Sequence, residues 1–148
     1  MRSRMSEVWV FFYGTFMSAR VLKQHGIHCE ETFPAKVSGY SLVIKPRVNL
    51  ERSGDSNCYG GLALVKHNDL TGLYQKVHEM FGQAYFPYPV MAELADGLFR
   101  QALCFISEKF DAGDPEPDYI DEMSQCAREM NAPSNYIMHI ESFKNVQR

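Results

Sequence analysis

The residues best suited to bind a small molecule lie where the first apolar run of the chain ends. Residues 8–17 read VWVFFYGTFM, and a run of about six Val, Trp and Phe residues is typical of a buried strand. Gly14 closes the run and lets a ligand approach the backbone. The next segment, SARVLKQHG, has helical character. A strand, a glycine and a helix start leave backbone N–H groups free to hold an anion, although the same pattern often marks a simple turn.

Composition indicates a single globular domain and argues against two classes of partner. The 148 residues are 45% hydrophobic and 22% charged, enough to bury a core without disulfides. A net charge of −3 with scattered Lys and Arg argues against a nucleic-acid surface. No apolar run approaches the roughly 20 residues of a membrane helix, and no signal peptide is recognisable. We therefore expect one cytoplasmic domain over residues 1–148, with residues 1–6 frayed.

The cysteines and histidines form no pattern typical of a metal site. Cys29, Cys58, Cys104 and Cys126 are far apart and include no C-x-x-C pair. Without an export signal, reduced thiols are expected. The five histidines lack a neighbouring Cys or acid at ligand spacing, so we predict no metal.

Hydrophobic periodicity predicts a mixed α+β fold in which helices flank a barrel-like sheet. Asn68 or Asp69 is expected to cap the central helix and Gly82 to end it, while Asp96-Gly97 suits a hairpin turn. The predicted strands after the opening run are Phe33–Val43, Tyr59–Val65, Tyr85–Leu94 and Phe99–Ile106. The predicted helices are Ser18–His25, Leu70–Gly82, Tyr119–Met130 and Pro133–Phe143. Two segments are expected to be irregular: a loop at Leu50–Asn57, and a linker at 108–118 that leads to the two terminal helices.

Two separated segments together resemble the γ-glutamylcyclotransferase family, which includes AIG2-like proteins. FFYGTF, residues 11–16, resembles the family's strand-ending Y-G-S/T loop. PEPDYIDEMSQCAREMNAPSNYI, residues 115–137, resembles a family tail in which Pro-x-x-Tyr leads a helix and a Pro-x-x-Tyr turn follows it. Between them, residues 59–62 (YGGL) resemble the family's V/W-G-x-L strand. The resemblance spans nearly the whole chain and implies the family's α+β fold.

The resemblance also implies a reaction and a substrate class. In the family, the α-amine of a γ-glutamyl group attacks its own γ-carbonyl, which releases an amine and closes 5-oxoproline. Such a lyase, formally an acyl transfer, needs no cofactor and no Ser or Cys nucleophile, because orientation supplies much of the rate. It does need a base and donors for the developing oxyanion. The partner implied is a small γ-glutamyl compound.

The residues implied to bind this substrate come from the opening loop and from one tyrosine. Gly14 and Thr15 would place their N–H groups at the reacting centre, and the Tyr119 hydroxyl would bond the substrate carboxylate. Taken without the resemblance, Tyr119 is a packing residue at a helix start. The substrate-binding residues implied are Val10, Phe11, Phe12, Tyr13, Gly14, Thr15, Phe16 and Tyr119.

The catalytic base is the point at which the sequence departs from the family. The family glutamate lies in a Leu-Asp-x-x-Glu-Gly pattern on the central helix, and its position falls here on Val77. Glu79 is the nearest carboxylate, but two residues from Val77 point to a nearly opposite helix face, where a solvated Glu is the alternative. The further candidates for the site are His78, Tyr85, Tyr88 and Glu93.

A second hypothesis keeps the pocket and omits the chemistry. A member of the same fold without the base would hold a small carboxylate or an acyl-amine ligand. A purely structural role would account for neither the loop nor the tail. The leaving amine and the oligomeric state are both left open by the sequence.

Overall fold

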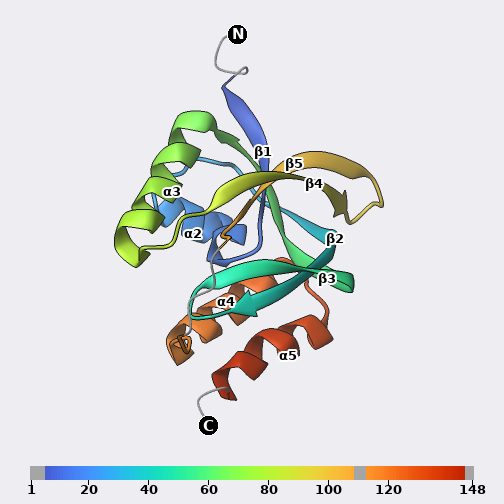
Figure 1. Cartoon of the computed structure of the whole chain (residues 1–148). Coiled ribbons are helices and arrows are strands. Elements are labelled where there is room, and N and C mark those ends of the chain that lie inside the picture. Colours follow the sequence, from blue (N-terminus) through green and yellow to red (C-terminus); the bar gives the residue numbers. More distant parts are fainter. Residues whose placement is uncertain (1–5, 109–112, 146–148) are drawn as a thin grey trace.

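The described residues form a mixed α+β fold in which helices flank one sheet (Figure 1). The computed structural model describes residues 6–108 and 113–145. The expected fraying of residues 1–5, and residues 109–112 of the expected linker, lie outside the described residues. The elements are β1 (Glu7–Phe12), η1 (Thr15–Met17), α2 (Ala19–Gln24), β2 (Phe33–Ile44), β3 (Val48–Lys66), α3 (His67–Phe81), β4 (Phe86–Leu94), β5 (Phe99–Ile106), α4 (Pro117–Glu129), α5 (Ser134–Ser142) and η2 (Phe143–Asn145).

The five strands pair in the order β1-β3-β2-β4-β5, and β5 returns to β1, so the sheet is barrel-like as predicted. β1 and β5 are parallel and the other pairs are antiparallel. Two of these strand pairings are short. β2 meets β4 through Ala35↔Leu94 and Lys36↔Glu93, and β1 meets β5 through Val10↔Leu103 and Phe11↔Cys104. The ring of strands is therefore held mainly by the long β2–β3, β4–β5 and β1–β3 pairings.

The opening run is apolar because both faces of β1 are covered along the second half of the strand. It pairs with β3 on one side and β5 on the other, and Val10, Phe11 and Phe12 are at most 2% exposed. A strand covered on both faces reads as a continuous hydrophobic run. Its carboxyl end is thereby placed at a fixed edge of the sheet, where the predicted loop begins.

The predicted loop at Leu50–Asn57 was wrong, because this segment belongs to β3. It pairs with β2 through Leu42↔Leu50 and Tyr40↔Arg52, and the turn comes earlier, where Lys45 N–H donates to Arg47 O over 3.0 Å. This part of β3 is largely exposed. Its stability comes from backbone pairing with β2, which does not depend on apolar side chains, and the polar composition was therefore misleading.

The two predicted chain reversals beside α3 and β4 are confirmed. Gly82 ends α3 in the left-handed region, with φ of 69°, and Gly97 turns the β4–β5 hairpin with φ of 89°. The start of α3 differs from the prediction. The helix begins at His67, and its N-cap is Lys66 without a side-chain hydrogen bond, so neither Asn68 nor Asp69 caps it.

The two terminal helices lie together beside the β2–β3 hairpin (Figure 1). The Tyr136 ring of α5 meets the Tyr59 ring of β3 edge-on at 5.0 Å, and His139 Nε2 bonds Leu42 O of β2 over 2.9 Å. All four cysteines are free thiols, as predicted. Among the described residues, no helix has the length and apolar character needed to cross a membrane.

Close packing of β3 against the end of β1, its antiparallel partner, predicts how one substitution changes stability. A Cβ at Gly60 would collide with the Phe12 carbonyl oxygen, whereas a Cβ at Gly54 on the same strand meets nothing within 4 Å. We expect Gly60→Ala to lower the free energy of unfolding by about 3 kcal/mol or more, because a backbone atom cannot move aside. Gly54→Ala should leave it unchanged or raise it by up to about 1 kcal/mol. Urea unfolding of the two variants measures the difference, and equal effects would contradict the close packing described.

Candidate functional site

One pocket of about 280 Å³ brings together the end of β1, the turn before β3, helix α3 and the start of α4. This volume suits a small metabolite. The residues that line the pocket are Phe12, Tyr13, Gly14, Thr15, Phe16, Val21, Gln24, His25, Arg47, Val48, Leu73, Tyr74, Lys76, Val77, Met80, Phe81, Tyr85, Tyr119 and Glu122.

The loop from Tyr13 to Phe16 forms one wall of this pocket. After β1 the chain enters the 3-10 turn η1, whose first hydrogen bond runs from Met17 N–H to Gly14 O over 2.9 Å. The N–H groups of Gly14 and Thr15 come before that bond in the chain. Neither of them donates a hydrogen bond to any of the described residues. Gly14 has ordinary extended angles, φ −99° and ψ −155°. A glycine is needed here for space, since a Cβ would lie 2.8 Å from Val48 Cγ1.

Three tyrosines hold the opposite walls in place. Val48 N–H donates to the Tyr119 hydroxyl oxygen at 3.4 Å, and the Tyr85 hydroxyl donates to Val48 O at 2.5 Å. Tyr74 stacks on Phe105 with ring centroids 4.1 Å apart. Both peptide groups that flank Val48 Cα are thus tied to aromatic side chains, so the backbone opposite Gly14 is fixed.

Three phenols of this pocket, those of Tyr13, Tyr74 and Tyr119, are neutral hydrogen-bonding groups. Burial raises the pKa of Tyr13 and Tyr74 well above the usual value. Burial also raises the pKa of Tyr119, with Arg47 and the Val48 N–H opposing the rise. A phenol that holds its proton at neutral pH cannot serve as a general base there.

The charged groups of the pocket come from three parts of the fold: the β2–β3 turn, α3 and α4. Arg47 and Lys76 bring positive charge, and Glu122 is the sole carboxylate among the described residues that line the pocket. The Arg47 guanidinium carbon lies 3.8 Å from the Phe81 ring centroid and 4.1 Å from that of Tyr119. Two cations and one carboxylate give this pocket a positive balance, which favours an anionic ligand.

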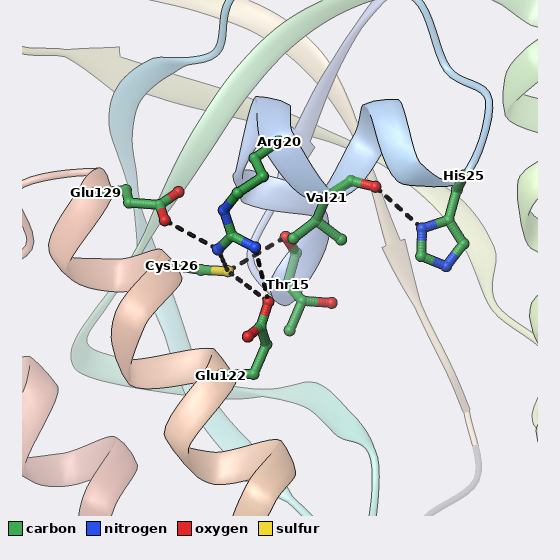
Figure 2. Close-up of polar contacts among 7 residues, drawn as sticks. All are labelled: Thr15, Arg20, Val21, His25, Glu122, Cys126 and Glu129. Atoms are coloured by element: carbon green, nitrogen blue, oxygen red, sulfur yellow. Dashed lines mark hydrogen bonds and ion pairs between the residues drawn. The ribbon is translucent and has the colours of Figure 1, made fainter.

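Figure 2 shows how Glu122 is held beside the loop. Arg20 of α2 donates to Glu122 Oε2 at 3.4 Å and to Glu129 Oε2 at 2.9 Å. Burial, together with the two glutamates, raises the pKa of Cys126 to about 12. Cys126 is therefore a neutral thiol, and it donates to Thr15 O at 3.6 Å. These contacts tie α4 to both α2 and the Tyr13–Phe16 loop.

His25 contributes an imidazole at the end of α2 (Figure 2). Its Nδ1 bonds the Val21 carbonyl oxygen at 3.0 Å, so Nδ1 carries the proton and donates. Its ring meets the Phe16 ring edge-on with centroids 5.1 Å apart. In the neutral tautomer Nε2 remains available as an acceptor.

The predicted substrate-binding residues are mostly brought together. Phe12 through Phe16 and Tyr119 all line the pocket, as does Tyr85. Val10 and Phe11 do not line it, since both are buried in the core of the sheet. Tyr119 turns its hydroxyl to the Val48 backbone, so its packing and binding interpretations are both compatible with its position.

None of the predicted acid–base candidates, which were Glu79, His78, Tyr88 and Glu93, lines the pocket. Val77 lines the pocket, and because a helix turns by about 100° per residue, Glu79 falls on the far side. Glu79 and His78 are exposed and do not line the pocket. Tyr88 lies near the start of β4, and its hydroxyl donates to Glu108 at 2.7 Å. Glu93 lies near the other end of that strand.

The pocket residues that were not predicted as site residues include His25, Arg47, Tyr74, Lys76 and Glu122. Tyr74 carried a signal, because it belongs to the apolar stripe of α3, and Lys76 lies on the same helix. His25 was considered only as a metal ligand. Arg47 and Glu122 carried no local signal, since each reaches the pocket only through the packing of elements far apart in the chain.

No family model matches the chain, and no curated protein was found to match it. Solved structures do match it. A γ-glutamyl cyclotransferase superposes with a TM-score of 0.75 over 91% of this chain and 86% of that one, at 13% identity. The fold is that of the γ-glutamyl cyclotransferases. This confirms the fold implied by the resemblance of the loop and the tail.

Two further solved structures support the γ-glutamyl cyclotransferase fold. A yeast γ-glutamyl cyclotransferase specific to glutathione matches with a TM-score of 0.64 and 11% identity, covering 97% of each chain. YkqA from Bacillus subtilis matches with a TM-score of 0.75 and 21% identity over 99% of this chain. The match covers 57% of YkqA, so this chain spans little more than half of that protein. At these identities the likeness shows the fold alone.

The contact between Gly14 and Val48 can be tested by a double-mutant cycle. Gly14→Ala should lower the free energy of unfolding by about 1–3 kcal/mol, because Val48 is held through its backbone and cannot withdraw. Val48→Ala removes the methyl group that the new Cβ would meet. We therefore expect the double variant to be more stable than the sum of the single effects by about 1 kcal/mol or more. Effects that add within about 0.5 kcal/mol would show that the contact is absent.

The raised pKa values of Tyr13, Tyr74 and Tyr119 predict a loss of stability at alkaline pH. Unfolded tyrosines release their protons near pH ~10, whereas the folded protein retains them to higher pH. The stabilisation from these buried phenols is thus complete below pH ~10, and it is lost as the pH rises through their pKa values in the folded protein. Phenolate absorbance should develop later in the native protein than in a urea-unfolded sample. Coincident titration curves would contradict the burial of these phenols.

Proposed function

We propose that this protein binds a small γ-glutamyl compound in the pocket and closes its γ-glutamyl group to 5-oxoproline, with release of an amine. The observation that carries the proposal is the pocket itself. It joins Gly14 and Thr15 of the opening loop to Tyr119 of the tail, the two segments on which the family resemblance rests. Solved structures of the same fold are named γ-glutamyl cyclotransferases, one of them specific to glutathione.

The charge of the pocket supports a ligand that carries carboxylates. Arg47 and Lys76 line it, while the Glu122 carboxylate already faces Arg20 at 3.4 Å. A γ-glutamyl group carries an α-carboxylate, which the positive charge of the pocket would attract. The apolar side chains of Leu73, Tyr74 and Val77 suit the methylene groups between its carboxylate and its amide.

The proposed reaction is intramolecular. The ligand's α-amine attacks the γ-carbonyl carbon, a C–N bond to that amine forms, and the C–N bond to the leaving amine breaks. The Gly14 and Thr15 N–H groups are the donors available to the γ-carbonyl oxygen as its negative charge develops. Glu122, the carboxylate at the pocket, takes a proton from the ligand's α-ammonium, which frees the amine to attack, and the protons that this nitrogen loses pass to the leaving amine as its C–N bond breaks.

A second candidate function is ligand binding without turnover. It is favoured by Val77, an apolar side chain that faces the pocket at the position where the family carries its catalytic glutamate. In this alternative the pocket retains its donors and cations, and Glu122 serves only its ion pair with Arg20.

Matched glutamate variants distinguish the two functions. The protein is incubated with a panel of γ-glutamyl amines, amino acids and peptides, and 5-oxoproline and melting temperature are measured. Glu122→Gln should lower turnover by about 10²–10⁴-fold, because it removes the proton acceptor. Glu79→Gln, which changes an exposed glutamate outside the pocket, should stay within about twofold of the parent protein.

Each alternative outcome has a definite meaning. A raised melting temperature without 5-oxoproline would replace turnover by binding alone. Loss of turnover in Glu79→Gln but not in Glu122→Gln would make Glu79 the base. If no compound in the panel binds, the proposed function is wrong.

A further inference from the structure

Arg47 is a cation whose charged group is held against two aromatic rings at the pocket. It lies in the turn just before β3, one residue from the fixed backbone of Val48. Its guanidinium carbon is 3.8 Å from the centroid of Phe81, the last residue of α3, and 4.1 Å from that of Tyr119 in the first turn of α4. Stacking on aromatic faces orients a guanidinium and leaves the N–H groups at its edge available.

Arg47 differs from the arginines that stabilise the helices. Arg20 and Arg128 both form ion pairs with glutamates of α4 or α5. Within residues 6–108 and 113–145, no carboxylate lies within 4.0 Å of the Arg47 guanidinium. A half-buried guanidinium at a pocket, to which no carboxylate of the described residues is bound, is suited to a bidentate bond with a ligand carboxylate.

The position of Arg47 indicates which part of a ligand it would reach. Its ring partner Phe81 is 40% exposed and the neighbouring Met80 is 70% exposed, so both lie at the mouth of the pocket. Tyr13 and Leu73 are at most 4% exposed and form its inner part. A γ-glutamyl group bound along the Tyr13–Thr15 loop would therefore direct the amine portion of the ligand toward Arg47.

We propose that Arg47 determines specificity by binding a carboxylate on the amine portion of the ligand, so that γ-glutamyl amino acids are preferred over γ-glutamyl amines of the same size. This inference rests on the proposed binding of a γ-glutamyl group. It does not depend on Glu122 as the base, since recognition of the outer carboxylate is the same with or without turnover.

Two compounds that differ only in this carboxylate test the proposal. γ-Glutamyl-2-aminobutyrate carries it, and γ-glutamyl-propylamine has a hydrogen in its place. Dissociation constants are measured by calorimetry, and where the compounds are turned over the ratio of kcat/KM is used instead. We expect the parent protein to prefer the aminobutyrate compound by about tenfold or more, as for a charge-assisted hydrogen-bonded pair.

Substitutions then assign the preference to Arg47. Arg47→Met keeps an unbranched side chain between the pocket and the rings, and should reduce the preference to near unity by weakening only the aminobutyrate compound. Arg47→Lys retains the charge without the flat guanidinium and should keep part of the preference. The matched control is Arg128→Met, which removes a positive charge on α4 outside the pocket and should keep the full preference.

The outcomes separate this inference from the proposed function. If the parent protein binds both compounds equally, or if Arg47→Met weakens both alike, the inference is wrong while γ-glutamyl binding stands. If neither compound binds, both are wrong. If Arg128→Met reduced the preference for the aminobutyrate compound as much as Arg47→Met does, the preference would arise from overall charge, and the proposed role of Arg47 would be wrong. Should Arg47→Met fail to fold, a preference of the parent protein that does not fall with rising salt would also overturn it.

Discussion

The pocket depends on one peptide segment, the backbone around Val48. Its N–H donates to Tyr119 from α4, and its carbonyl oxygen accepts from Tyr85, which precedes β4. Its side chain occupies the space that Gly14 leaves open. Three parts of the chain that are distant in sequence are therefore held at defined positions around a single residue. Loss of either hydrogen bond would loosen the wall opposite the donors of the loop.

The negative and positive groups of this pocket lie at different ends of it. Glu122 is held by Arg20 and contacts the Cys126 thiol that bonds Thr15 O, whereas Arg47 lies at the mouth against two rings. The tyrosines between them keep their protons, because burial raises the pKa of Tyr74 and Tyr119. A ligand with an amine near the loop and a carboxylate near the mouth would satisfy both ends. The proposed reaction and the proposed specificity both use this separation of charge.

The same fold does not imply the same catalytic residue. The cyclotransferase fold is established by superposition over nearly the whole chain, yet Val77 faces the pocket on α3. Glu79, two residues further, is directed away by the geometry of the helix. A carboxylate from α4 is instead present at the pocket. Function in such a fold resides in the side chains at the pocket, and these must be established one by one.

Local sequence features determined the elements that short-range physics controls. The apolar run of β1, the stripe of α3 with Gly82 at its end, and the Asp96-Gly97 turn were all predictable, because each depends on side chains within a few residues of one another. The segment from Leu50 to Asn57 was not predictable. This segment forms a strand because its backbone pairs with β2, and its own polar side chains give no indication of that pairing.

The loop at Gly14 was recognisable from the sequence by itself, since a strand-ending Y-G-T and the tail together resemble a known family. Only the tertiary structure decided which charged groups share its pocket. Arg47 and Glu122 are 75 residues apart, and nothing near either one in the chain marks it as a site residue. They share the pocket with the loop because β3 and α4 both pack against η1, in which the loop continues. Periodicity reports which face of an element is buried, whereas the side chains that converge on a pocket are determined by how distant elements pack together.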